Sequence, residues 1–298
     1  MKKADIKTGF LCNNNCRFCV QGEVKKKLGN KSTGEVRKIL KDAAKDCEIV
    51  VFTGGEPTIR NDIVALVKYA KKLNFKIIQM QTNGRMFVHK KFCVAMIKAG
   101  VNEFGLSLHG HTPELHNRLT GANSFYQTIT GIKNLIALNQ FVAINIVITK
   151  LNYRYLPEII KLLIGLRVEH IQLAFVHATG SAKENFNSIV PRKSIVMPYV
   201  KKALDIGRLF NRIIKTEAIP YCFLTGYYEC ISENTRPDGK IYYEFDKVVL
   251  HSTYVRRNID KKKGPACKQC KYYIVCEGPW KEYPDKFGWT EFIPIKNQ

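Results

Sequence analysis

Hydrophobic and polar positions follow two alternating patterns along the first two thirds of the chain. Short runs rich in Val, Ile and Phe are typical of strands, and the segments between them carry apolar residues every three or four positions, as helices do. The run IVVFTGG is apolar throughout and ends in glycines, which suits a strand buried on both faces. We predict strands at residues 4–10, 49–55, 76–82, 103–110, 141–149 and 168–177, and helices at 32–47, 60–73, 89–99, 124–139 and 155–165.

Six strands separated by helices predict a parallel sheet with right-handed crossovers. Such a sheet is either a partial (βα)6 barrel or an open doubly wound sheet, and in both the functional site lies at the carboxyl ends of the strands. Polar residues gather at those predicted ends, in GGEPT (54–58), QTNGR (81–85) and SLHGH (107–111), and at Thr149 and His177. We therefore predict a site along this edge.

The pattern changes beyond about residue 190. A helix is predicted at 196–213, followed by a short strand in IIKTEAIP (213–220). The segment 227–245 then reads as a hairpin, with PDGK as the tight turn between two alternating stretches. We predict two domains, an α/β core over residues 1–215 and a small α+β domain over residues 216–298.

Composition places the chain among ordinary globular proteins. Its 298 residues are 45% hydrophobic, enough for one large core and a smaller module. No run of about 18 apolar residues occurs, so no membrane span is predicted. The segment MKKADIKTGF is too polar for a secretory signal, and we expect a cytoplasmic protein.

The formal net charge of +23 leaves two interpretations open. A strongly basic chain suggests a nucleic-acid partner. The basic residues nevertheless occur as short groups, such as 25–27 and 261–263, and several fall on the polar faces of predicted helices. This distribution favours a solvated surface or an acidic peptide partner over a nucleic acid.

The ten cysteines are unevenly distributed, and in a reducing compartment clustered cysteines are metal ligands more often than disulfides. One group is Cys12, Cys16 and Cys19, and a second is Cys267, Cys270 and Cys276. Cys222 and Cys230 lie between the groups, while Cys47 and Cys93 are predicted to be ordinary buried thiols.

The first group has the spacing C-x3-C-x2-C, which suits iron–sulfur or zinc. An iron–sulfur cubane normally takes four cysteines. Three thiolates leave one iron with an open position, in the way that a catalytic zinc keeps one for substrate. A small chelating molecule can bind that iron and receive an electron from it.

This triplet, with Phe18 before the last cysteine and GGEP after the second predicted strand, resembles the radical S-adenosylmethionine (SAM) enzymes. The resemblance implies a [4Fe-4S] cluster on Cys12, Cys16 and Cys19, with SAM chelated through its amino and carboxylate groups. Reductive cleavage of SAM then gives a 5′-deoxyadenosyl radical that removes a substrate hydrogen. An electron donor such as ferredoxin or flavodoxin is also implied.

The resemblance also implies which residues contact SAM. Gly54, Gly55, Glu56 and Pro57 match the segment that binds the methionyl amino group, where glycine allows close backbone approach and a carboxylate accepts from an ammonium. The remaining expected SAM contacts are Phe18, Thr82, Asn83, Ser107, Arg118, Thr149 and Phe175.

Three of the candidate site residues, Arg118, Phe175 and His177, have simpler alternatives. Arg118, expected to neutralise the SAM carboxylate, reads equally as an exposed helix arginine, and Phe175 as a core residue. The segment SLHGHTPELHNRLTG matches a peptide- and cofactor-modifying subfamily at His116, with His109 and Asn117 replacing aspartates. His177 is expected either to face the substrate or to be an ordinary histidine of the rim.

The second group, C-x2-C-x5-C, resembles the auxiliary-cluster modules called SPASM and their shortened form, twitch. The full motif has a fourth cysteine near where Pro279 and Trp280 stand, so a one-cluster, twitch-like module is expected. Its ligands for an auxiliary [4Fe-4S] cluster are expected to be Cys222, Cys267, Cys270 and Cys276, with Cys230 as the competitor for the fourth position. Zinc is the alternative metal.

The sequence therefore predicts a partial (βα)6, TIM-like barrel with a small iron–sulfur domain. The expected reaction modifies a peptide, a protein side chain or a small-molecule cofactor precursor, and is oxidative or rearranging. One alternative is a radical-SAM enzyme that modifies transfer RNA, and another is a zinc-stabilised, non-catalytic nucleic-acid-binding protein.

Overall fold

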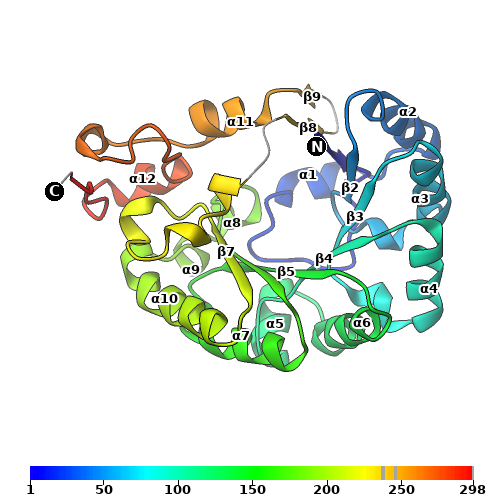
Figure 1. The fold of residues 1–298 in the computed structure, drawn as a ribbon, viewed down its shortest axis with the longest axis horizontal. Coiled ribbons are helices and arrows are strands. Elements are labelled where there is room, and N and C mark those ends of the chain that lie inside the picture. Colours follow the sequence, from blue (N-terminus) through cyan, green and yellow to red (C-terminus); the bar gives the residue numbers. More distant parts are fainter. Residues whose placement is uncertain (236–238, 245–246, 297–298) are drawn as a thin grey trace.

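The computed structural model, which describes residues 1–235, 239–244 and 247–296, consists of one curved sheet with helices around its outer side (Figure 1). The strand order is β7-β6-β5-β4-β3-β2-β1-β8-β9. All neighbouring strands are parallel except β8 and β9, which are antiparallel. This arrangement confirms the predicted open, TIM-like barrel.

The strands are β1 (Lys3–Lys7), β2 (Ile49–Thr53), β3 (Ile77–Thr82), β4 (Glu103–Ser107), β5 (Val142–Ile148), β6 (His170–Phe175), β7 (Ile213–Glu217), β8 (Lys240–Tyr243) and β9 (Val248–Val249). The helices are α1 (Gly22–Lys27), α2 (Thr33–Ala43), α3 (Ile63–Lys72), α4 (Lys90–Ala99), α5 (Pro113–Thr120), α6 (Phe125–Ala137), α7 (Leu156–Gly165), α8 (Ser181–Glu184), α9 (Phe186–Ile189), α10 (Lys193–Leu209), α11 (Ser252–Val255) and α12 (Glu282–Phe287).

The six strands and five helices predicted for the first two thirds are all present, most of them one to a few residues shorter than predicted. The start of α2 shows the local cause of one boundary. The Ser32 hydroxyl accepts from the Glu35 N–H while the Glu35 carboxylate accepts from the Ser32 N–H at 2.7 Å, a capping box. The short strand predicted at 213–220 is also present, as β7.

Successive side chains along a strand point in turn toward the core and toward the barrel interior. On β5, Ile144, Ile146 and Ile148 are fully buried against the helices, whereas Asn145 and Val147 line a cavity inside the barrel. On β2 the three central residues are all buried, as predicted for a strand covered on both faces. The core therefore lies between sheet and helices, and the interior is left for polar residues.

The hairpin predicted over residues 227–245 is wrong in its first half. Residues Tyr228–Cys230 and Ser232–Thr235 form 3₁₀ turns, because backbone bonds such as Cys230 N–H to the Tyr227 carbonyl close locally instead of across a ladder. The second half is β8, which pairs with β1 and β9. Two residues of the predicted turn, Pro237 and Asp238, lie outside the described residues. The predicted 216–298 segment thus adds two strands to the barrel sheet.

Candidate active site

The first cysteine group lies on the loop between β1 and α1, and neighbouring elements hold this loop in place. The Asn15 and Arg17 N–H groups donate to the carbonyls of Thr120 (2.8 Å) and Leu119 (3.0 Å) at the end of α5. Arg85, just after β3, donates to the Asn14 side chain at 3.0 Å and to the Asn13 carbonyl. The loop is therefore fixed by residues that follow two other strands.

Cys12, Cys16 and Cys19 line one cavity of about 820 Å³ inside the barrel. Burial is the main reason that the pKa values of Cys12 and Cys16 are raised, and the neighbouring thiols raise them further. Thiols that influence one another in this way hold their protons until a metal replaces them.

The donor set fits a [4Fe-4S] cluster held by three thiolates, since soft sulfur ligands suit iron–sulfur chemistry. No three His, Cys, Asp or Glu side chains of the described residues lie close enough together to ligate a single metal ion. The fit therefore rests on donor chemistry and on the cavity that the three thiols share.

The two glycines after β2 permit a close approach to the cysteine loop. A Cβ on Gly54, whose φ is +125°, would lie 2.2 Å from the Gly9 carbonyl oxygen, and a Cβ on Gly55 would lie 2.3 Å from that of Leu11. The Gly55 N–H donates to the Gly9 carbonyl at 2.8 Å. Any larger residue would push the cysteine loop away from β2.

Glu56 is buried and connects the end of β2 to the end of β3. Its Oε1 accepts from the Thr58 N–H at 3.0 Å and the Thr82 hydroxyl at 2.7 Å, and its Oε2 accepts from the Asn83 N–H at 2.6 Å. Burial raises the pKa of this carboxyl despite these donors. Oε2 receives one described donor, so it retains capacity to accept from a ligand ammonium.

Most of the predicted SAM contacts lie around the same cavity. The lining residues include Phe18, Gly54, Gly55, Glu56, Thr82, Asn83, Ser107 and Phe175. Pro57 is buried and begins a 3₁₀ turn (Pro57–Ile59), and it is not among the lining residues. Phe175 also belongs to the hydrophobic core, because its side chain is buried there, with Lys193 Nζ 3.1 Å from the ring centroid.

Besides Pro57, the structure places two further predicted contacts away from the cavity lining. Arg118 is exposed, because α5 turns its buried face, with His116 and Leu119, toward the core. Thr149 is fully buried, and its hydroxyl donates to the Asn152 side chain at 2.9 Å. On β5 the cavity is lined by Asn145 and Val147 instead.

The two positions where aspartates were expected have distinct structural roles. His109 lines the cavity, and its Nδ1 accepts from the Val147 N–H at 3.2 Å, so the neutral ring carries its proton on Nε2. Burial lowers the pKa of His109 to about 3. Asn117 accepts from the N–H groups of Ser124 (2.9 Å) and Phe125 (3.0 Å) and so caps α6.

Sequence reasoning missed the charged interior of the barrel. Lys3, Asp5 and Lys7 alternate along β1 and line the cavity, where Asp5 pairs with Lys240 of β8 at 2.8 Å. Lys7 pairs with Glu244. The period-2 placement of charges in KADIK was the available signal.

The second cysteine group is assembled from two distant segments. Cys222, Cys267, Cys270 and Cys276 line one small pocket of about 30 Å³. Burial, followed by the three other thiols, raises the pKa of Cys222 to about 12. Cys230 is not among the lining residues, and its sulfur lies 3.6 Å from a carboxylate oxygen of Glu229. Four thiols around one pocket fit an enclosed iron–sulfur cluster.

The C-terminal module, which we define as residues 250–296, also contributes to the barrel cavity. Trp280 stacks on His177, which follows β6, with ring centroids 4.0 Å apart, and both line the cavity. His177 Nε2 lies 3.2 Å from the Glu282 carboxylate. His177 therefore holds the module against the barrel and faces the cavity as well.

Comparison with known proteins identifies the class. The sequence model of the Radical SAM superfamily matches residues 6–163, more than half of the chain, so the protein belongs to this superfamily. It is accordingly an iron–sulfur enzyme that uses a [4Fe-4S] cluster and SAM. Among the described residues, no helix is long and apolar enough to span a membrane.

Individual relatives share about one third of their aligned residues with this chain. Proteins named "Probable GTP 3′,8-cyclase" are 33% identical over 180 residues in Saccharolobus islandicus and 32% over 207 residues in Saccharolobus solfataricus. These alignments cover 59% and 67% of this chain, and 57% and 65% of the relatives' lengths.

Two solved structures share the fold. Streptococcus suis SuiB bound to S-adenosylmethionine has a TM-score of 0.69 and 17% identity, over 98% of this chain and 76% of its own. anSMEcpe with bound AdoMet and the Kp18Cys peptide has a TM-score of 0.70 and 18% identity, over 94% and 89%.

Proposed function

We propose that this enzyme oxidises a polar substrate held in the barrel cavity. The observation that carries the proposal is the contrast between three thiols on a large cavity and four thiols around a small pocket. Cys12, Cys16 and Cys19 would hold the SAM-binding cluster, and Cys222, Cys267, Cys270 and Cys276 an auxiliary one. When bound, the first cluster with SAM supplies a hydrogen-abstracting radical, and the second supplies an acceptor for the substrate's remaining electron.

The protein's own residues position these parts. Glu56 and the two preceding glycines fix the cysteine loop relative to β2 and β3. The polar interior, with Gln79, Asn145 and the paired ions of β1 and β8, matches a hydrophilic substrate. The stacked pair of Trp280 and His177 forms part of the cavity wall.

A second candidate substrate class comes from the relatives. Their name, GTP 3′,8-cyclase, favours a nucleotide over a peptide, at 32–33% identity across about three fifths of the chain. The four-thiol pocket argues for an electron acceptor in either case, because four thiolates leave none of the four irons open to substrate.

The test uses anaerobically purified enzyme with both thiol groups loaded with iron, SAM and a reductant. Separate reactions contain GTP, ATP, a small-molecule fraction or a peptide fraction of the source cells, and 5′-deoxyadenosine and product mass are measured. We expect one reaction to increase 5′-deoxyadenosine release and to yield a product two hydrogens lighter, with one methionine formed per product. A stimulated reaction whose product has unchanged mass contradicts oxidation, and the absence of stimulation in every reaction contradicts the proposed substrate cavity.

A further inference from the structure

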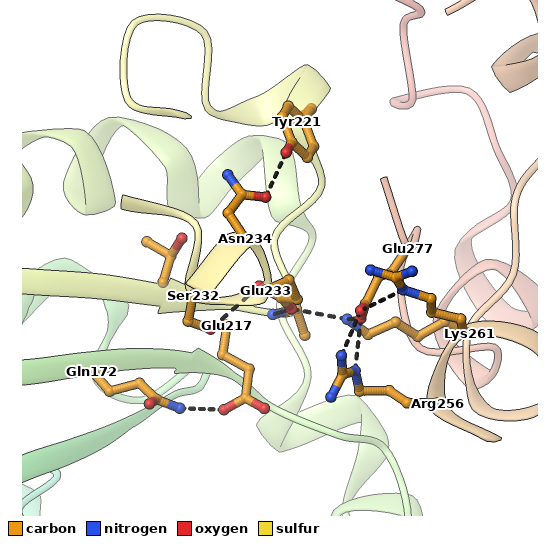
Figure 2. Close-up of polar contacts among 12 residues, drawn as sticks. Gln172, Glu217, Tyr221, Ser232, Glu233, Asn234, Arg256, Lys261 and Glu277 are labelled. Atoms are coloured by element: carbon orange, nitrogen blue, oxygen red, sulfur yellow. Dashed lines mark hydrogen bonds and ion pairs between the residues drawn. The ribbon is translucent and has the colours of Figure 1, made fainter. Parts of the chain in front are cut away.

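A buried ion cluster lies between the C-terminal module and the segment after β7 (Figure 2). The Glu277 carboxylate accepts from Arg256 Nε at 2.8 Å, from Arg256 Nη2 at 2.6 Å and from Lys261 Nζ at 2.7 Å. Lys261 also lies 2.9 Å from a Glu233 oxygen, and Arg257 lies 3.3 Å from Glu277. Three cations thus share two carboxylates, so the cluster has one positive charge in excess.

Arg256 is the member of this cluster that lines the barrel cavity. Glu277 occupies two of its three guanidinium nitrogens, and none of the described residues accepts from the third, Nη1. In Figure 2 this nitrogen points away from Glu277, toward the side where Glu217 and Gln172 lie. Both of these residues line the same cavity. The two bonds from Glu277 therefore fix the guanidinium plane with one edge toward the interior.

Trp280 lies beside the same ion cluster. Its indole N–H is buried and has no acceptor among the residues that the structure describes. Trp280 lines the cavity, and its ring centroid lies 5.0 Å from Lys261 Nζ. A buried donor without an acceptor is unfavourable, and a ligand oxygen that accepts from it would remove this cost.

Basic side chains outnumber acidic ones among the described residues of the cavity wall. Of the described residues that line it, six are basic and four are acidic. Lys240 and Lys7 are neutralised by Asp5 and Glu244. The Glu217 carboxylate, which accepts from the Gln172 amide, lies on the side that Arg256 Nη1 faces. Arg256 belongs to the cluster with excess positive charge.

We propose that Arg256, with the Trp280 N–H, binds an oxyanion of the substrate, a phosphate or a carboxylate. The inference rests on the proposed function, because it takes the barrel cavity as the substrate site, and it names the chemical class of the substrate. A planar guanidinium held by a carboxylate behind it offers its free edge to oxyanions without loss of side-chain freedom.

Binding of two probes tests the proposal without any turnover. Inorganic pyrophosphate and succinate are titrated by calorimetry into the iron-loaded enzyme, with saturating SAM so that the SAM carboxylate cannot be mimicked. We expect Arg256→Gln to weaken the preferred probe about 10- to 100-fold, the usual loss for a charge-assisted pair. Arg256→Lys should weaken it less, and Trp280→Phe, which keeps the ring stacked on His177, about tenfold.

The matched control is Lys262→Gln, which removes a neighbouring exposed cation that pairs with Asp285 at 2.9 Å. It should leave probe binding within about twofold, since exposed pairs contribute little. Preference for pyrophosphate or for succinate identifies the anion as phosphate or carboxylate, and either supports the proposal. The proposal is overturned if neither probe binds, if Arg256→Gln leaves binding unchanged, or if Arg256→Gln and Lys262→Gln lose binding equally. Unchanged binding in Trp280→Phe would remove the indole N–H from the proposed site.

SAM cleavage in the absence of substrate is measured on the same samples, together with iron content and circular dichroism. Wild-type enzyme that cleaves SAM but binds neither probe contradicts the oxyanion site alone. Enzyme that binds a probe at Arg256 but never releases 5′-deoxyadenosine contradicts the proposed function alone.

Discussion

The two cysteine groups use the same ligand chemistry in opposite surroundings. Cys12, Cys16 and Cys19 lie within eight residues of one loop and line a cavity of about 820 Å³. Cys222 is more than forty residues away from its three partners, and the four line a pocket of about 30 Å³. The difference teaches that the number of thiolates and the space beside them, more than ligand type, separate a metal site that can bind a second molecule from one whose ligands all come from the chain.

The largest expected effect comes from removing a thiol of the three-thiol group, Cys12, Cys16 and Cys19, which we call the open group. Cys16→Ala leaves two of three ligands, so the enzyme should lose about four irons per chain and release no 5′-deoxyadenosine above background. Iron analysis and chromatography of the nucleoside measure both. Cys47→Ala, a buried thiol outside both groups, should retain iron and SAM cleavage. Normal SAM cleavage by Cys16→Ala would remove the distinction between the two groups.

The four-thiol group, which is Cys222 with Cys267, Cys270 and Cys276, is tested by comparing Cys222→Ala with Cys230→Ala. Cys222 lines the pocket with the other three thiols, whereas Cys230 lies beside Glu229. We expect Cys222→Ala to lose the auxiliary iron, again about four per chain, while substrate-independent SAM cleavage persists. Cys230→Ala should keep all its iron. The reverse pattern would reassign the fourth ligand, and no loss in either variant would leave only three thiols around the pocket.

The sequence predicts a group of residues best when its members lie close together in the chain. The open group, its spacing and GGEP lie near strand ends, so periodicity placed them correctly. Cys222 follows the predicted strand at 213–220, and the structure places it around one pocket with the other three thiols. The ion cluster of Arg256, Lys261, Glu277 and Glu233 had no local signal, because its contacts join residues 16 to 28 positions apart and form only in the folded chain.

A smaller effect concerns the wall of the open cavity. Burial lowers the pKa of His109 to about 3 and of His116 to about 4, below the ordinary value near 6.5. The unfolded chain therefore binds more protons than the folded one below pH 6.5, and stability is lost as pH falls toward 4. The expected loss from His116 is about 3 kcal/mol.

Urea unfolding between pH 8 and pH 5, followed by tryptophan fluorescence, measures this slope. His116→Gln should flatten the pH dependence, whereas His251→Gln, at an exposed position, should leave it unchanged. Equal slopes in wild type and His116→Gln would mean that His116 gains a proton in the folded protein, and that the cavity wall is more open to water than its burial indicates.

The smallest expected effect marks the boundary of the open site. Sequence resemblance placed Arg118 against the SAM carboxylate, but its side chain is exposed on α5 and does not line the cavity. Arg118→Ala should therefore change SAM affinity by less than about twofold, since solvent screens an exposed charge. Ser107→Ala, which alters a residue that does line the cavity, should weaken SAM binding more, by up to about tenfold for a lost hydrogen bond. Equilibrium dialysis of labelled SAM into the iron-loaded enzyme measures both. If Arg118→Ala were the weaker binder, α5 would have to rotate when SAM binds, because in this structure its buried face directs His116, and not Arg118, toward His109.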